Sequence, residues 1–343
     1  MKPGEVIEIL PGDIRPARYA EAGIPFNIHE PIALLPGPTA ADVDVITAMS
    51  RGVNAAAFRV HTDQSGRTTV VQPDDVALTS GKNRLRWAVS SAARSADGTT
   101  WFMNNPAKLP SGTPRVWRVP RNGEALQFAD LTGLQLSRDR VRLTTLPDGR
   151  VGYLADGRPR ALPRVPGPVP ALGGIDRLTA TGAGGYLAAV RTASQAAIQI
   201  VRVGADGSRK TFTIPPSVRP GPLRSDHTKS ALPTFHGTVV ALTPDGQGGA
   251  YVAVASKLVD DALGVDYSAG SMLLRVRSEG ETTLLTTGDL TSSRTCPDWP
   301  SSTRLEEMES NLGRITDLSL HGDQLWIADA ACRRVLSLRT AEP

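Results

Sequence analysis

The chain has 343 residues, of which 40% are hydrophobic and 5% aromatic, and its formal net charge is +4. This composition supports a packed core and excludes a low-complexity chain, because the 33 Gly and 27 Pro are spread among turn positions. Acidic and basic residues are interleaved and no apolar run is long enough to span a bilayer, so we expect neither a nucleic-acid partner nor a transmembrane segment.

Tight turns of two kinds alternate along the chain. The first kind precedes an aromatic or β-branched strand, at Asp97-Gly98, Asp148-Gly149, Gly184-Gly185, Asp245-Gly246 and Gly322-Asp323. The second kind lies inside a later hairpin, at Ser65-Gly66, Asn122-Gly123, Asp206-Gly207 and Glu279-Gly280. Asp-Gly and Asn-Gly pairs tolerate the positive φ angles that two-residue hairpins require. Two turns per unit predict four antiparallel strands, A to D, which is the pattern of a propeller blade.

The fold class that we predict is all-β, a six-bladed β-propeller forming a single domain over residues 1–343. Seven blades are the nearest alternative, followed by a pair of β-sandwiches or an irregular solenoid. The third blade is short and lacks a clear second turn, so its outer strand is in doubt. The last blade ends early, and we expect the N-terminal strand 5–10 to close it. The blades cover roughly 33–72, 85–129, 141–165, 175–215, 237–287 and 314–339.

The last blade carries the clearest motif, Leu325-Trp326-Ile327-Ala328-Asp329 followed by Arg334-Val335. It resembles the NHL repeat, in which an aromatic-Val-Ala-Asp strand is followed by Asn and then Arg-Val. The resemblance implies a propeller of about six blades, used mostly for binding or sensing. Related six-bladed folds, the strictosidine-synthase-like and gluconolactonase-like families, include enzymes, so the fold leaves catalysis open. Cys332 stands where the NHL repeat usually has Asn.

Two features of this motif read as structural. Asp329 is expected to cap backbone N–H groups or to pair with Arg334, thereby tying blade strands together. Aromatic residues at one recurring blade position are expected to pack between blades. These aromatic residues are Trp101, Tyr153, Tyr186, Tyr251 and Trp326.

The long connections fall on one side of the predicted blades. A–B and C–D turns lie at one face of a propeller, and B–C and D–A connections lie at the other. Most tight turns belong to the first group, and loops as long as those of the second group usually carry function. We therefore predict that the face with the long D–A and B–C loops is the functional surface. The long segments are 11–32, 103–114, 216–236, 256–270 and 288–313.

Histidine and carboxylate residues occur in these loops, and this combination serves acid–base catalysis or metal binding. The candidate ligand-binding residues are His29, Glu30, Asp226, His227 and Trp299. No spacing matches a zinc signature, a P-loop or a serine nucleophile elbow, so no catalytic residue and no metal site is assigned. Solvent exposure or loop packing is the alternative role of His29 and His227. His61 is expected at the surface, and His236 and His321 are expected to be structural.

The segment from Asp260 to Asp266 contains three carboxylates and could be read as a calcium loop. It lacks the alternate-residue pattern and the terminal Glu of an EF-hand. We therefore interpret it as a solvated loop.

The two cysteines, Cys296 and Cys332, are both predicted on the loop-bearing face of the last blade. A disulfide between them would close about 36 residues and contribute on the order of 3–4 kcal/mol. It would also favour an oxidising compartment. The alternative is two free, half-buried thiols in a cytosolic protein.

These observations lead to two main functional hypotheses, and a purely structural interaction module is the third alternative. The first is a monomeric binding or sensing propeller that engages a small molecule, a glycan or a protein and needs no cofactor. The second is a metal-assisted hydrolase or lyase whose site uses a divalent metal near His29 and His227. The excess of arginine over lysine suggests a GC-rich bacterium. We expect an extracellular or cell-surface location if a leader was removed before Met1, and a cytoplasmic one otherwise.

Overall fold

The computed structural model of the chain is built almost entirely from β-strands. It describes residues 4–10, 30–37, 39, 42–48, 55–62, 68–71, 89–104, 113–120, 126–134, 141–182, 184–191, 197–215, 219–220, 237–260, 265–288, 303–305 and 312–340. No α-helix occurs in this part of the chain, and so none that could span a membrane. The chain divides into two compact units. One unit comprises residues 13–186, and the other comprises residues 187–343 together with residues 1–12.

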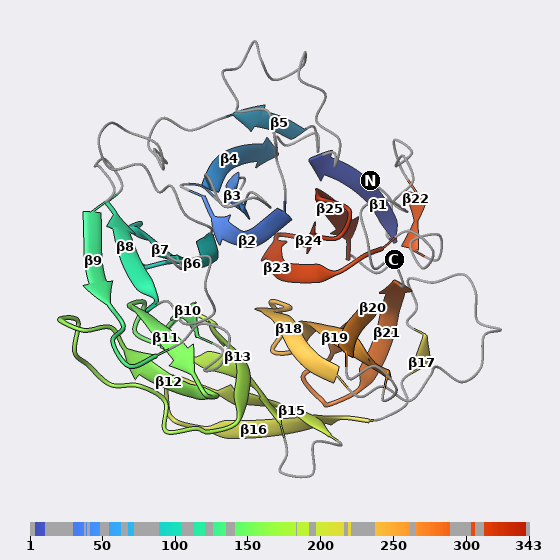
Figure 1. The fold of residues 1–343 in the computed structure, drawn as a ribbon. Helices are drawn as coiled ribbons and strands as arrows, with labels where there is room; N and C mark the ends of the chain where they lie inside the picture. The colour runs from blue at the N-terminus through green and yellow to red at the C-terminus, as the bar shows by residue number, and fades with distance from the viewer. Residues whose placement is uncertain are drawn as a thin grey trace. The chain divides into compact units, whose positions relative to one another are not determined.

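The described strands form six sheets (Figure 1), which confirms the all-β class and the six-bladed β-propeller. In blades one to four the strand order inside each sheet follows the chain, as expected of blades built from successive antiparallel strands. The unit 13–186 contains β2 (Glu30–Pro36), β3 (Asp42–Ala48), β4 (Ala55–Thr62) and β5 (Thr68–Val71) in blade one; β6 (Val89–Arg94), β7 (Thr100–Asn104), β8 (Arg115–Val119) and β9 (Leu126–Asp130) in blade two; and β10 (Arg142–Thr145), β11 (Val151–Ala155) and β12 (Arg158–Ala161) in blade three.

The boundary between the two units lies after Tyr186, inside blade four. Blade four consists of β13 (Ile175–Ala180), β14 (Tyr186–Arg191), β15 (Ile198–Val203) and β16 (Arg209–Ile214). Blade five consists of β17 (Arg219–Pro220), β18 (Gly237–Pro244), β19 (Ala250–Asp260), β20 (Val265–Val276) and β21 (Thr282–Gly288). Blade six consists of β1 (Glu5–Leu10), β22 (Thr303–Arg304), β23 (Ile315–His321), β24 (Gln324–Asp329) and β25 (Arg334–Arg339). Blades five and six depart from the chain order at their outer edges, where β17 pairs parallel with β21 and where β1 lies between β25 and β22. That all blades form one domain stays a prediction.

Blade six is completed by the N-terminal strand, as predicted. β1 pairs antiparallel with β25, with Val6 opposite Leu338 and Ile7 opposite Ser337. The short β22 then pairs with the outer edge of β1. Because these pairings satisfy the backbone N–H and C=O groups along β25 and part of β1, they remove an exposed sheet edge.

Blade three has three strands, β10, β11 and β12, so the outer strand that the sequence left in doubt is absent from this sheet. The segment 162–174 follows β12 and leads to β13. It contains Pro163, Pro166, Pro168 and Pro170, which have no N–H with which to extend a ladder. The chain therefore passes from blade three to blade four without adding a fourth strand.

The segment 256–270 of blade five differs from the prediction of a loop. β19 and β20 continue as a paired ribbon, with Leu258 opposite Tyr267 and Asp260 opposite Val265. The alternating and β-branched residues of this stretch favour a strand, and its acidic residues had suggested a solvated loop instead. The acidic stretch thus contains strand residues, and residues 261–264 lie outside the described residues.

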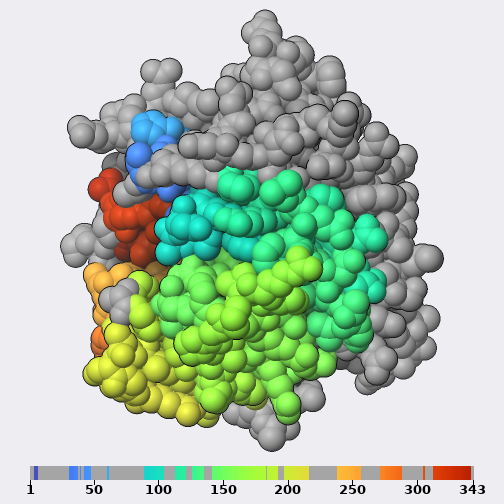
Figure 2. Space-filling view, turned by 90° about the vertical axis from the view of Figure 1, so that its left-hand side faces the viewer, coloured from blue at the N-terminus to red at the C-terminus, as the bar shows by residue number. Residues whose placement is uncertain are grey.

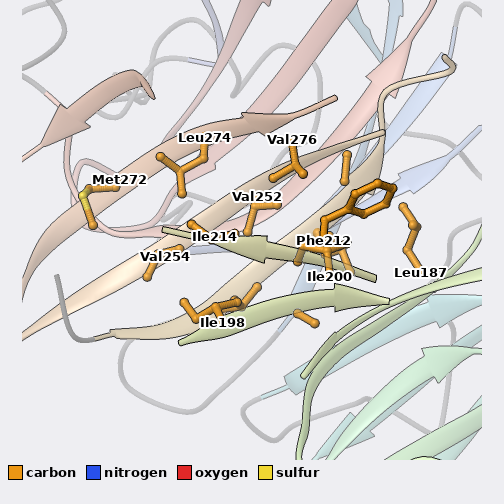
Figure 3. Packing of buried hydrophobic residues seen from close by; sticks show 14 of the residues in the cluster. Leu187, Ile198, Ile200, Phe212, Ile214, Val252, Val254, Met272, Leu274 and Val276 are labelled. Carbon is orange, nitrogen blue, oxygen red and sulfur yellow. The ribbon is translucent and has the colours of Figure 1, made fainter. Parts of the chain in front are cut away.

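The cores lie between neighbouring sheets. Figure 3 shows one of them, where Phe212 and Ile214 of β16 and Ile198 of β15 pack with Val252 of β19 and Leu274 of β20. In β16 only Phe212 and Ile214 are buried, which is the alternation expected of a half-covered strand. Each such buried aliphatic or aromatic side chain stabilises the fold by about 1.5–3 kcal/mol. The predicted packing role of the recurring aromatics is confirmed for Trp101, Tyr153, Tyr251 and Trp326, which are buried, whereas Tyr186 is half-buried.

Hydroxyl groups connect successive blades inside each unit. The Ser91 hydroxyl of blade two accepts from the Leu143 N–H of blade three at 3.0 Å. The Ser271 hydroxyl of blade five accepts from the Ile315 N–H of blade six at 2.9 Å. Both bonds satisfy a backbone donor that begins an inner strand, so they help to fix where that strand enters its blade.

Candidate functional site

Most of the predicted site residues fall in segments that the structure does not describe. His29, Asp226, His227 and Trp299 lie outside the described residues, as do Cys296 and His236. Glu30 is described and is the first residue of β2, where it lies opposite Ala48. The prediction that Glu30 lies in a loop is therefore wrong, because β2 begins earlier than expected. It still lies at the end of blade one to which the D–A and B–C connections belong, which we call the loop end of a blade; the opposite end is the turn end.

The turn ends of the blades use their own polar groups. The Asp97 carboxylate accepts from the Ser95 hydroxyl at 2.6 Å and from the Thr99 N–H at 3.0 Å. These hydrogen bonds, led by the one from Ser95, hold the pKa of Asp97 below its ordinary value. Asp245 likewise accepts from the N–H groups of Gln247 and Gly249. Both carboxylates accept hydrogen bonds within their own turns and thereby stabilise the turn geometry. Neither Asp97 nor Asp245 is therefore left without a hydrogen-bond donor for a ligand to replace.

The glycines of these turns take the conformation that the sequence predicts. Gly98 and Gly149 have φ values of 82° and 79°, and Gly207 has 79°. A residue with a side chain is strained at such angles, so the turn sequence itself determines the geometry.

At the loop end of blade six, Asp329 and Arg334 form a buried ion pair. Arg334 Nε donates to Asp329 Oδ2 at 3.2 Å, and the two side chains are 2% and 0% exposed. The same carboxylate accepts from the N–H groups of Gly313 at 3.1 Å and Cys332 at 3.3 Å. Both predicted roles of Asp329, capping and pairing with Arg334, are therefore confirmed. The carboxylate thereby connects the backbone just before β23, at Gly313, to the B–C connection at Cys332.

Burial raises the pKa of Asp329, while Arg334 and the two N–H donors oppose this effect. A raised carboxyl pKa can mark a catalytic acid. Here the carboxylate is fully buried and its oxygens are occupied by three protein donors, so no substrate reaches it. We therefore assign Asp329 to the scaffold.

The inner strands of blades one, two, five and six share a β-bulge at their loop ends. The register shifts between Pro31 and Ala33 in β2, between Val89 and Ser91 in β6, between Val239 and Ala241 in β18, and between Ile315 and Asp317 in β23. In blades two and six the bulged residue is hydroxylic: Ser90 donates to Met103 O at 3.2 Å and Thr316 to Ala328 O at 3.4 Å. Bulges re-aim side chains and are common beside functional sites. The sequence did not predict these bulges, because a single extra residue does not disturb the alternation enough to be read.

The ribbon of blade five is the largest described feature at a loop end. β18 pairs with β19 no further than Ser256, and β21 pairs with β20 no further than Ser271. Beyond these positions Lys257–Asp260 and Val265–Ser268 pair only with each other among the described residues. The ribbon therefore extends past its blade at the loop end.

No group of three or more His, Cys, Asp or Glu side chains within the described ranges could hold a metal ion. His61, predicted at the surface, is half-exposed, and its Nδ1 lies 2.8 Å from Asp42 Oδ1. His321 lies at the end of β23, and its Nε2 is 2.9 Å from the Ser319 hydroxyl, in agreement with a structural role. Both histidines thus have local partners.

Comparison with known proteins gives no family assignment. No family model matches the chain, and no curated protein matches it. Among solved structures it is similar to a gluconolactonase from Xanthomonas campestris, with 14% identity and a TM-score of 0.29 over 86% of this chain and 68% of that one. A puromycin hydrolase matches with 13% identity and a TM-score of 0.41 over 90% and 44% of the two chains. The WD40 β-propeller domain of Doa1 matches with 10% identity and a TM-score of 0.36 over 92% and 97%. Similarity at this level assigns no activity, and the NHL resemblance is not confirmed.

Proposed function

We propose that the protein is a binding or sensing β-propeller that engages a small molecule, a glycan or a protein through the loop ends of its blades. The observation that carries the proposal is the ribbon of β19 and β20, which continues past blade five at its loop end. An isolated two-stranded ribbon is marginally stable in water. Contact with a ligand or partner would stabilise this ribbon by burying apolar surface, as neighbouring strands do within the blades.

The contrast between the two ends of the blades supports the same proposal. Turn-end carboxylates such as Asp97 and Asp245 are satisfied by their own turns. The loop ends carry the long connections, and binding residues gather on loops that a rigid scaffold positions. The role also accords with the use of NHL propellers, to which the blade-six motif is similar.

A disulfide between Cys296 and Cys332 belongs to this proposal. Cys332 is buried at the loop end of blade six, where its N–H donates to Asp329. No cysteine among the described residues is a free thiol, while Cys296 lies outside them. The bridge would fasten the segment 288–313 to the loop end and favour an oxidising compartment.

The test combines a ligand screen with a deletion. Glycans, small metabolites and metal ions are screened by thermal shift, and lactone and glycoside substrates are assayed for turnover. Removal of residues 257–268 leaves Ser256, Ala269 and Gly270 to join Ala255 to Ser271, a three-residue connection of a common hairpin length. Glu279→Ala, at the turn end of the same blade, is the matched control.

We expect a hit to bind the wild-type protein and the Glu279→Ala variant alike and to lose binding in the deletion. Ligand binding that survives the deletion but fails in the control would overturn the assignment to the loop ends. Turnover that requires a divalent metal and depends on His29 or His227 would establish the hydrolase or lyase alternative instead.

A further inference from the structure

Three arginines surround the outer strand of blade three without a partner. Arg158 and Arg160 lie on β12 and Arg164 follows it, and all three are exposed. None of the three guanidinium groups makes a hydrogen bond or an ion pair within the described residues. Asp156, exposed in the short connection before β12, leaves the local charge positive.

Three other arginines in the unit 13–186 form ion pairs with aspartates. Arg94 Nη2 lies 2.6 Å from Asp44 Oδ2, Arg115 Nε lies 3.4 Å from Asp130 Oδ1, and Arg150 Nη2 lies 2.6 Å from Asp148 Oδ2. The arginines around β12 thus differ from their neighbours. Like charges without counter-charges raise the free energy of a folded chain, so such a set is more readily explained by an external anion.

The arginines are held on a fixed frame. Arg158 and Arg160 alternate with the buried Pro159, so their side chains leave the same side of β12. The segment after β12 is anchored by Arg150, whose Nη1 donates to Val165 O and whose Nη2 donates to Pro168 O, each at 3.0 Å. Arg164 lies in this anchored segment, beside Val165, so its backbone is held as well. Because the backbone is held and the guanidinium group is planar, less conformational entropy is lost when these arginines bind carboxylates.

Apolar side chains are exposed on β9 of blade two and in the segment after β12 of blade three. Leu126 on β9 is 53% exposed and Val169 in the segment after β12 is 38% exposed, and these are the exposed large hydrophobic residues of the described chain. Phe128 of β9 and Val165 pack against one shared core cluster, which joins the outer parts of blades two and three. These two blades, teal to green, face the viewer in Figure 2.

We propose that the outer side of blade three, with Arg158, Arg160 and Arg164, docks an acidic polypeptide segment that also carries apolar side chains. Guanidinium groups recognise carboxylates through charge-assisted, bidentate hydrogen bonds. Leu126 and Val169 give the apolar part of the contact. A single-stranded nucleic acid fits less well, because no Phe, Tyr or Trp side chain whose burial the structure describes is exposed for a base to stack on. These residues belong to blade three, whereas the binding proposed above uses the ribbon of blade five.

The test measures binding of a fluorescein-labelled peptide of Glu with interspersed Leu, by anisotropy, to the full chain at low and physiological ionic strength. The variant is Arg158→Glu, Arg160→Glu and Arg164→Glu together. The control carries the same charge change on exposed positions of blade four, Arg202→Glu, Arg209→Glu and Lys210→Glu. A triple Arg→Gln variant of blade three removes the same charges without reversing them, so it serves if the charge reversal prevents folding. Circular dichroism checks that each protein is folded.

We expect the blade-three reversal to weaken binding about tenfold or more, the Gln variant to fall between, and the blade-four control to change it less than about twofold. Leu126→Ser should weaken the Glu–Leu peptide and leave polyglutamate unaffected. Equal loss in both reversals would overturn the proposal, since net charge alone would then explain binding. Tighter binding of a single-stranded oligonucleotide of equal charge that is lost in the same variant would overturn it in favour of nucleic acid.

Discussion

Blade six and blade three stand at the two extremes of this repeat. Blade six has the full motif, a buried Asp329–Arg334 pair and an outer edge covered by β1 and β22. Blade three keeps Tyr153 of the motif but has three strands, a proline-rich segment after β12 and arginines without partners. In blade six Asp329 and Arg334 join strands, whereas in blade three Arg158, Arg160 and Arg164 face solvent. In a blade with the complete repeat, the residues of the pattern build the scaffold. In a blade that departs from the pattern, polar residues are left available to contact other molecules.

The largest effect should come from breaking the blade-six pair. Asp329→Ala leaves Arg334 charged and buried, and we expect it to lower the free energy of unfolding by about 3–5 kcal/mol. Asp323→Ala removes an ion pair with Arg339 whose side chains are 43% and 38% exposed, and should cost less than about 1 kcal/mol. Chemical denaturation measures both, and similar losses would show that Asp329 has no special role.

The predicted bridge to Cys332 comes next. Reduction should lower the free energy of unfolding by about 3–4 kcal/mol, because the unfolded chain regains the freedom of a long loop. Cys332→Ser should reproduce that loss and make stability insensitive to reductant. Two titratable thiols in the unreduced protein would contradict the bridge and the oxidising compartment.

Blade three should respond more weakly and more locally. Arg150→Ala removes two hydrogen bonds to the segment 162–174 and should cost about 1–2 kcal/mol. Released from this anchor, the chain should be cut by trypsin after Arg164 under native conditions. Arg115→Ala, which breaks a pair with both partners near 40% exposed, serves as the control and should leave the cleavage rate unchanged.

The pH dependence of stability gives the smallest effect. Because burial raises the pKa of Asp329, the native state keeps this proton to higher pH than the unfolded chain does. The contribution of Asp329 to stability therefore falls as pH rises from the ordinary value, 3.8, through the raised one. Asp329→Asn should abolish this dependence, so that the stability of the wild type relative to this variant decreases from acid to neutral pH. An increase over that range would mean that Arg334 outweighs desolvation.

The sequence predicted the scaffold better than the site. Asp-Gly turns and the spacing of aromatics indicated six blades, because turn geometry and burial depend on local residues. The N-terminal strand could be assigned because blade six ended one strand short. The ribbon of blade five was missed, since Asp260 and Asp266 resemble loop residues when their cross-strand partners are unknown. The arginines of blade three were missed too, because the absence of a counter-charge is a property of three dimensions and not of spacing.

In the proposed function, the residues that build the blades are distinct from the loop ends that bind. Thermal shift of three proteins with a screened ligand tests it most directly: the wild type, Asp329→Asn, and the deletion of residues 257–268. We predict that Asp329→Asn lowers the melting temperature of the free protein but keeps the ligand-induced shift. The deletion should leave the free protein nearly unchanged and abolish the shift. Loss of the ligand-induced shift in Asp329→Asn, with a normal shift in the deletion, would show that ligand binding depends on the blade-six pair and not on the ribbon of blade five.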